Sequence, residues 1–236
     1  MNSLSPKEPQ YQFMLDMQQE YGNIQMTCRA SSRWRLDPKS LGFTLARYKF
    51  VAKMLSGYSQ VLEIGCGDGF ASRVTHPEVK ELHGIDFDPV FIDEAKRHTE
   101  PEWSVTFTVH DILESPFLMN GENAYDAAFS LDVIEHISQK YERKYLENIC
   151  LSLKPNGIFI CGAPSLESQA YASEASKEGH INCKSGKDLK NLLDEFFEHT
   201  FLFGMNDEVL HTGFTPMCHY LLVLAVGNKL VLQYDK

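Results

Sequence analysis

The chain has 236 residues, of which 43% are hydrophobic, enough for the core of one α/β domain. Its formal net charge of −10 excludes a nucleic-acid polymer as the expected substrate, because a polyanion is repelled by an acidic protein. No apolar run approaches the roughly 18 residues that span a bilayer. The N-terminus also lacks a basic segment followed by an apolar one. We therefore expect a cytoplasmic protein that does not bind membranes.

Two helices are predicted before the first strand. Residues 10–21 combine aromatic, Met and Leu side chains with polar ones, and we expect this helix to lie across another surface. Residues 40–56 carry apolar side chains at helical spacing, and Gly57 is well suited to end that helix. We assign residues 1–57 to a helical cover and residues 58–236 to the main domain.

The basic side chains concentrate in this cover. Residues 29–53 contain seven Lys and Arg residues but one carboxylate, Asp37. Such a run is either a solvated helix face or a local site for a small anion. Because the segment precedes the first predicted strand, we expect its helices to fold over the ligand site.

The rest of the chain alternates strands and helices. Strands are predicted at residues 60–65, 81–86, 105–111, 125–132 and 158–164, and helices at about 70–75, 88–99 and 139–153. The last helix should turn Tyr141, Tyr145, Leu146, Ile149 and Leu153 inward and stop at the "KPNG" of residues 154–157. A further helix is expected at 185–197, followed by strands at 199–205 and 218–226 joined by a loop. This order predicts a seven-stranded, mostly parallel sheet with an antiparallel closing pair and helices on both faces.

The turn after the first predicted strand holds three glycines in "GCGDG", residues 65–69. In an open α/β sheet, ligands bind at the carboxyl ends of the strands, where the first turn normally lies. The dinucleotide motif G-x-G-x-x-G requires a third glycine at the position of Phe70, and no phosphate-loop lysine follows. The turn therefore favours a nucleoside ligand without a pyrophosphate, with a ligand-free tight turn as the alternative.

Acidic residues follow the next strands. Asp86 ends the second strand, where a carboxylate can accept hydrogen bonds from ribose hydroxyls. Asp111 ends the third strand beside Ile112, a pair suited to the amino group and the face of adenine. "SLDVIEH" ends the fourth strand, where the reacting end of the ligand should lie. One acid alone could be a helix cap, but acids at successive strand ends indicate a ligand site.

These segments together resemble a known family. "VLEIGCGDG", "GIDFDP", "HDI", "YDAAFSLDVIEHI" and "LKPNGIFICGAPS" are similar to the successive motifs of the class I S-adenosylmethionine-dependent methyltransferases. The resemblance covers residues 61–165 and implies a Rossmann-like fold, S-adenosyl-L-methionine as cofactor and S-adenosyl-L-homocysteine as product. The C-terminal segment also resembles methyltransferases associated with bacterial surface-polysaccharide synthesis.

The resemblance implies a role for each matching residue. Gly65, Cys66 and Gly67 form the turn that the methionine and ribose parts approach, and Glu63 orients that turn or the cofactor's amino group. Asp86 would bind the ribose, Phe87 and Ile112 would pack on adenine, and Asp111 would hold its amino group. Leu131 or Asp132 would face the methionine amino group, and Arg47 lies where some small-molecule methyltransferases place an arginine for the cofactor carboxylate.

A hydroxyl acceptor also needs a base near its proton. His136 follows the fourth strand, and His180 lies in a loop after the fifth, where this fold often builds its acceptor wall. Each is a candidate base, and each could instead be a structural or surface histidine. The basic cover favours a small anionic or nucleotide-linked acceptor, methylated at oxygen. N-methylation, a nicotinamide-dependent oxidoreductase and a binding module without activity are the alternatives, and Phe70 argues against the oxidoreductase.

Metal-binding patterns are weak in this sequence. The six cysteines contain no C-x-x-C pair, so we expect free thiols rather than disulfides or a zinc site. Residues 205–219 contain Asp207, Glu208, His211 and His219, a set of side chains that could bind a metal. We predict instead a hydrogen-bonded loop over the active site, and no metal site in the protein.

Overall fold

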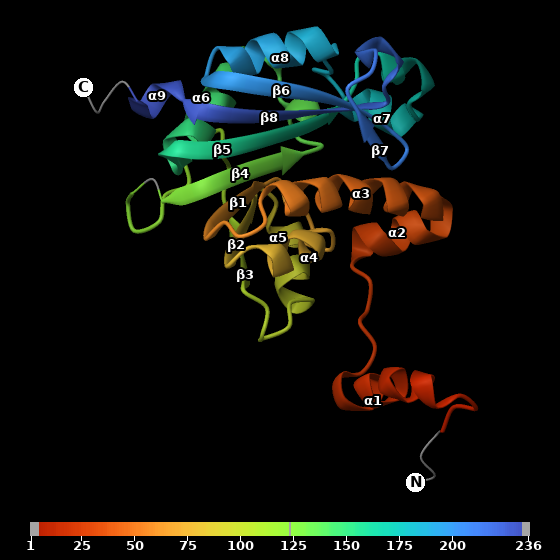
Figure 1. Cartoon of the computed structure of the whole chain (residues 1–236). Coiled ribbons are helices and arrows are strands. Elements are labelled where there is room, and N and C mark those ends of the chain that lie inside the picture. Colours follow the sequence, from red (N-terminus) through yellow and green to blue (C-terminus); the bar gives the residue numbers. More distant parts are fainter. Residues whose placement is uncertain (1–4, 123, 233–236) are drawn as a thin grey trace.

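The computed structural model describes residues 5–122 and 124–232, and its central feature is one twisted sheet (Figure 1). Within the described residues the strand order is β3-β2-β1-β4-β5-β8-β6-β7. The strands are β1 (Gln60–Ile64), β2 (Glu81–Asp86), β3 (Val105–Val109), β4 (Tyr125–Leu131), β5 (Leu153–Pro164), β6 (Phe197–Asn206), β7 (Val209–His211) and β8 (Tyr220–Asn228).

The first five strands pair in parallel, and β8 then pairs antiparallel with both β5 and β6. The predicted mostly parallel sheet with an antiparallel closing pair is confirmed. The predicted strand number is wrong by one, because β7 forms inside the segment expected to be a loop. This strand has three residues and pairs only with the end of β6, from Asn206↔Val209 to Gly204↔His211. A strand this short leaves no alternation pattern to detect.

The α-helices are α1 (Gln12–Tyr21), α2 (Cys28–Leu36), α3 (Pro38–Met54), α4 (Ser72–Thr75), α5 (Pro89–Arg97), α6 (Glu142–Ser152), α7 (Glu174–Gly179), α8 (Gly186–Asp194) and α9 (Lys229–Leu232). Several begin at caps that local sequence predicts. Asp88 accepts from the Val90 amide to open α5, and Ser185 accepts from the Asp188 amide to open α8. Helix α2 was not predicted.

Helix α6 ends differently from the prediction. It stops at Ser152, because Leu153 already has an extended backbone, and "KPNG" lies within β5 rather than between two elements. Tyr145, Leu146 and Ile149 are buried as expected, but Tyr141 is 45% exposed. Tyr141 precedes the helix, in a short 3-10 turn, so helical spacing does not apply to it.

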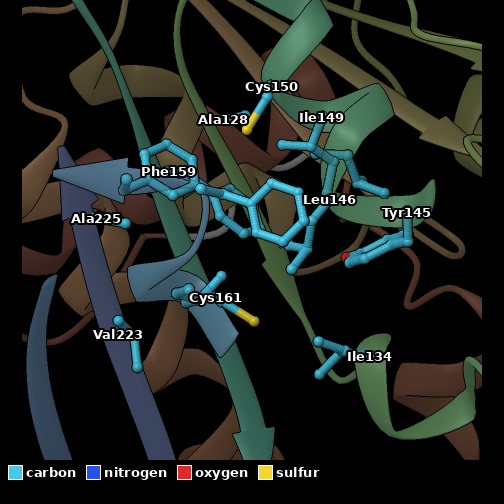
Figure 2. Close-up of a cluster of buried hydrophobic side chains, with 14 of the residues drawn as sticks. Ala128, Ile134, Tyr145, Leu146, Ile149, Cys150, Phe159, Cys161, Val223 and Ala225 are labelled. Atoms are coloured by element: carbon cyan, nitrogen blue, oxygen red, sulfur yellow. The ribbon is translucent and has the colours of Figure 1, made fainter. Parts of the chain in front are cut away.

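Two hydrophobic layers sandwich the sheet. One joins α6 and α8 to the strands, with Tyr145, Leu146, Ile149, Leu189 and Leu193 among its members. Figure 2 shows this layer around Leu146 and Phe159. The other layer joins α3 and α5 to the opposite face through Tyr48, Val51, Leu55, Ile92 and Ala95. The second half of the predicted cover is therefore part of the main core.

Helix α1 lies apart from the sheet, connected to α2 by an extended segment (Figure 1). It has no buried side chain among the described residues, and Phe13, Met14 and Tyr21 are exposed. Within the described residues this helix buries no side chain, so the surface that it was expected to lie across is not identified.

Two expectations about the chain as a whole can be compared with the fold. All six cysteines lie in the described part and are free thiols, as predicted. Among the described helices, none is both long and apolar enough to cross a bilayer.

Truncating the core side of α6 should destabilise the protein. Leu146 is 0% exposed, and Leu146→Ala should lower the free energy of unfolding by about 2–5 kcal/mol, because it leaves a cavity. Leu151→Ala is the matched control, since Leu151 lies on the same helix and is 38% exposed. Urea unfolding measures both. Equal losses in the two variants would contradict the packing described for α6.

Candidate active site

The glycine turn lies where the strand order reverses. Strand β1 pairs with β2 on one side and β4 on the other, so the crevice at their carboxyl ends opens at this turn. Gly65 and Gly67 have φ of 75° and 55°, which side-chain-bearing residues rarely adopt. A Cβ at Gly65 would also lie 2.3 Å from Cγ2 of Val133, just after β4. The turn therefore brings bare backbone against the end of β4.

Asp86 braces this turn from the end of β2. Its Oδ2 accepts from the Gly67 amide at 2.9 Å, and its Oδ1 accepts from the Asp88 amide at 3.0 Å. Each carboxylate oxygen accepts more than one hydrogen bond, so the group can still receive hydroxyl donors. Phe87 beside it is 72% exposed and available to a flat ligand.

Asp111 and Ile112, expected to contact adenine, follow the end of β3 and are largely engaged within the protein. Asp111 lies two residues beyond β3, and its Oδ1 accepts from the Leu113 amide at 2.8 Å, as in a turn cap. Ile112 is 5% exposed and belongs to the α6 side of the core. The role expected for Ile112 at adenine stays a prediction, and the burial of its side chain leaves little of it available to a ligand.

Glu63 is a buried carboxyl beneath the turn. The Tyr48 hydroxyl donates to its Oε1 at 2.7 Å, while Oε2 has no partner among the described residues. Burial raises the pKa of Glu63 to about 7, although hydrogen bonds oppose this effect. Glu63 contacts α3 through Tyr48, so it ties the turn's strand to the cover.

Arg47 pairs with Asp132 rather than pointing into solvent. Its Nη1 lies 3.1 and 3.0 Å from the two oxygens of Asp132, and its guanidinium stacks on the Tyr220 ring at 3.7 Å. Burial alone would lower the pKa of Arg47, but Asp132 and Tyr220 raise it above its ordinary value. Asp132 has a φ of 58°, in the left-handed region that Asp tolerates better than most residues. The ion pair therefore fixes the chain directly after β4.

Two arginines that sequence reasoning did not single out reach the same cavity. Its walls include Arg29, Arg33, Tyr48, Gly65, Cys66, Asp68, Leu131 and Asp132. Arg33 bonds the hydroxyl of Thr44, and burial together with Arg29 and Arg47 lowers its pKa, against the effect of Asp132. Asp68 accepts from the Arg29 amide at 2.8 Å and so caps α2. The basic run of the sequence pointed to this segment but not to these two residues.

The two candidate histidines come together. Their ring centroids lie 5.2 Å apart, although His136 follows β4 and His180 follows α7. His136 Nδ1 bonds the Gly179 carbonyl at 2.8 Å, and His180 Nδ1 bonds Oε1 of Gln169 at 2.9 Å. Glu135 beside them is fully buried, and neither of its carboxylate oxygens has a partner among the described residues. Burial and the nearby Asp132 carboxylate raise the pKa of Glu135 well above its ordinary value.

The acids and histidines between β6 and β8 do not form a cluster like that of Glu135, His136 and His180. In the described chain, Asp207, Glu208, His211 and His219 do not bring three metal-ligating atoms together. His211 instead accepts from the Gly213 amide at 3.0 Å. The expected loop is instead the short strand β7, paired with β6, and a hydrogen-bonded turn after it.

Comparison with known proteins agrees with this geometry. Residues 61–157 match the family model described as "Methyltransferase domain". The ubiquinone biosynthesis O-methyltransferase of Cereibacter sphaeroides is 28% identical over 113 residues, 48% of this chain and 44% of that protein. The phosphoethanolamine N-methyltransferase of Plasmodium falciparum is 29% identical over 107 residues, 45% of this chain and 39% of that protein. The chain thus matches less than half the length of these curated relatives.

A solved structure extends the likeness to the fold. The N-methyltransferase NodS of Bradyrhizobium japonicum, crystallised with S-adenosyl-L-homocysteine, has a TM-score of 0.57 and 21% identity. It covers 82% of this chain and 91% of its own. Residues 61–157 of this chain therefore match a methyltransferase domain, and the described fold is that of a solved methyltransferase. The bare glycine turn and the Asp86 carboxylate beside it suit S-adenosylmethionine as the cofactor of this domain.

Glu63, the buried carboxyl beneath the glycine turn, should make the stability of the protein depend on pH. Glu63 has an ordinary pKa of 4.5 and a folded pKa of about 7. The folded state therefore binds more protons between these values, so stability falls as pH rises through this window and stays lower above it.

Glu63→Gln should remove about 3 kcal/mol of that fall, because one pKa unit corresponds to about 1.4 kcal/mol. Urea unfolding at pH 5 and pH 8 measures the difference. Glu114→Gln is the control, since Glu114 is exposed and should keep the wild-type dependence. Identical pH dependence in Glu63→Gln and wild type would contradict the burial effect.

Proposed function

We propose that this chain transfers the methyl group of S-adenosylmethionine to an oxygen of a small, anionic acceptor. The observation that carries the proposal is the continuity of the site. Gly65 of the cofactor turn abuts Val133, and the His136–His180 pair begins three residues later, beyond Asp132. A cofactor held by the turn would have its reacting end between Asp132 and the histidines.

When bound, the cofactor supplies a sulfonium that carries an activated methyl group. The chain's residues position both reactants, and alignment of the acceptor supplies much of the acceleration. Asp86 would hold the ribose, and the backbone of Gly65 and Gly67 would receive the methionine part. Transfer to a hydroxyl forms an O–C bond as the S–C bond breaks, and the hydroxyl proton must leave. The histidine pair promotes that loss, either as a base or through a group that it binds.

The arginines support an anionic acceptor. Arg29 and Arg33 line the cavity, and Arg47 is paired with Asp132, which also lines it. We assign Arg33, which is partly buried, to the cofactor carboxylate in place of Arg47. Arg29 is exposed and is left for a carboxylate or phosphoryl group of the acceptor. Nucleotide-linked sugars, including those of bacterial surface-polysaccharide synthesis, carry such a group, and one relative is named for a phosphorylated substrate.

This assignment separates two binding constants. Arg33→Met should weaken S-adenosylhomocysteine binding about 10- to 100-fold, because a hydrogen bond to a charged group contributes about 1.5–3 kcal/mol. Arg29→Met should raise the acceptor KM and leave that affinity unchanged. Arg35→Met on the same helix is the control, since Arg35 is exposed and outside the cavity lining. Calorimetry and steady-state kinetics measure the two effects. If all three variants changed S-adenosylhomocysteine affinity and acceptor KM equally, the assignment of Arg33 to the cofactor and Arg29 to the acceptor would be contradicted.

A screen of phosphorylated and nucleotide-linked metabolites tests the activity itself. Formation of S-adenosylhomocysteine with one of them, and an O-methyl product by mass spectrometry, is the expected result. His136→Ala should then reduce turnover about 10²- to 10⁴-fold and keep cofactor affinity, since it affects only the acceptor's proton. Activity with neutral or cationic acceptors alone would contradict the anionic acceptor. An N-methyl product would contradict oxygen as the acceptor atom.

A further inference from the structure

Glu135, His136 and His180 bring one ligand atom each within 4.8 Å of one another. Glu135 and His136 belong to a short 3-10 turn after β4, and His180 follows α7. Side chains from two separate segments thus converge on one point beside the cofactor turn. Two imidazoles and one carboxylate form a ligand set suited to first-row divalent metals.

Both histidines are already oriented as metal ligands. The Gly179 carbonyl is an acceptor, so Nδ1 of His136 carries the proton and Nε2 keeps its lone pair. Gln169 also fixes the proton of His180 on Nδ1. The Gln169 amide nitrogen lies 3.2 Å from the Ser165 carbonyl and 3.3 Å from the Ser168 hydroxyl oxygen, so the amide oxygen faces Nδ1 of His180 and accepts from it. Such hydrogen bonds to the second ring nitrogen are typical of histidines that bind metals.

Glu135 supplies an independent observation. Its side chain is 0% exposed, and both oxygens lack a hydrogen-bond partner among the described residues. A buried carboxyl without donors is costly, and a cation beside it removes that cost. The distance from Oε1 to His136 Nε2 is 3.9 Å, while two ligands of one tetrahedral Zn²⁺ lie about 3.4 Å apart. His136 is exposed, so a small movement of its ring closes the difference.

We propose that Glu135, His136 and His180 bind one divalent metal ion, such as Zn²⁺ or Mn²⁺. Three protein ligands leave at least one coordination position open. On the proposed function, on which this step rests, that position faces the acceptor. An ion there would bind the acceptor hydroxyl and lower its pKa, so that the proton leaves to water before methyl transfer. The metal then replaces a free histidine base.

Metal binding is measured first without cofactor or acceptor. Protein treated with a chelator and dialysed should take up one equivalent of Zn²⁺ by calorimetry and elemental analysis. His180→Ala and Glu135→Gln should lose this binding, and Gln169→Leu should weaken it about 10- to 100-fold by releasing the His180 ring. His199→Ala is the control, because His199 is exposed on β6, away from the cluster. Circular dichroism confirms that each variant is folded.

The outcomes separate the site from the proposed function. No Zn²⁺ or Mn²⁺ uptake, or uptake unchanged in both Glu135→Gln and His180→Ala, would overturn the metal site. Methyl transfer that persists at full rate in chelated protein would overturn the role of the metal in the reaction, and would leave the methyltransferase activity standing. One equivalent of metal lost in both ligand variants supports the site, even if no acceptor in the screen is methylated.

Discussion

The ion pair between Arg47 and Asp132 joins the two parts from which the site is built. Arg47 comes from α3, and Asp132 directly follows β4. The pair therefore links α3 to the carboxyl end of a central strand. The Arg47 guanidinium also stacks on the ring of Tyr220 on β8, so the contact extends to the antiparallel strands. Asp132 follows Leu131, which lines the cavity at the glycine turn, and precedes the 3-10 turn that carries Glu135 and His136. The pair therefore holds α3 against the segment that connects this cavity to the two candidate ligands.

Two acids near this ion pair are buried, Glu63 on β1 and Glu135 three residues after Asp132. Glu63 under the turn and Glu135 beyond it each keep at least one oxygen without a partner in the described chain. Burial of these oxygens is only partly compensated within the chain, which is expected where bound ligands bring positive charge. A divalent ion beside Glu135, as proposed above, would account for the unpaired oxygens of that residue. Conversely, Arg29 and Arg33 bring positive charge to the cavity lining, which is where the proposed cofactor and acceptor carry negative groups.

The sequence predicted the elements whose signals are local. Asp88 and Ser185 cap their helices through neighbours two and three residues away, and the glycine turn is recognisable by composition. Helix α2 was missed because its caps are distant. Glu94 accepts from the Cys28 amide, and Asp68 accepts from the Arg29 amide, across 66 and 39 residues. No rule based on sequence neighbours detects such a cap. The partner of Arg47, 85 residues away, escaped prediction for the same reason.

The histidines show the same limit at the level of chemistry. Taken singly, His136 and His180 are alternative bases, since a pattern of residues does not place them beside each other. In the fold they share one space, and the Gly179 carbonyl and the Gln169 amide fix a proton on each Nδ1. Each ring then offers one lone pair, and that lone pair either accepts a proton or binds a metal. Two imidazoles within reach of a buried carboxyl that lacks partners in the described chain favour the metal, because a single base needs neither the second ring nor Glu135.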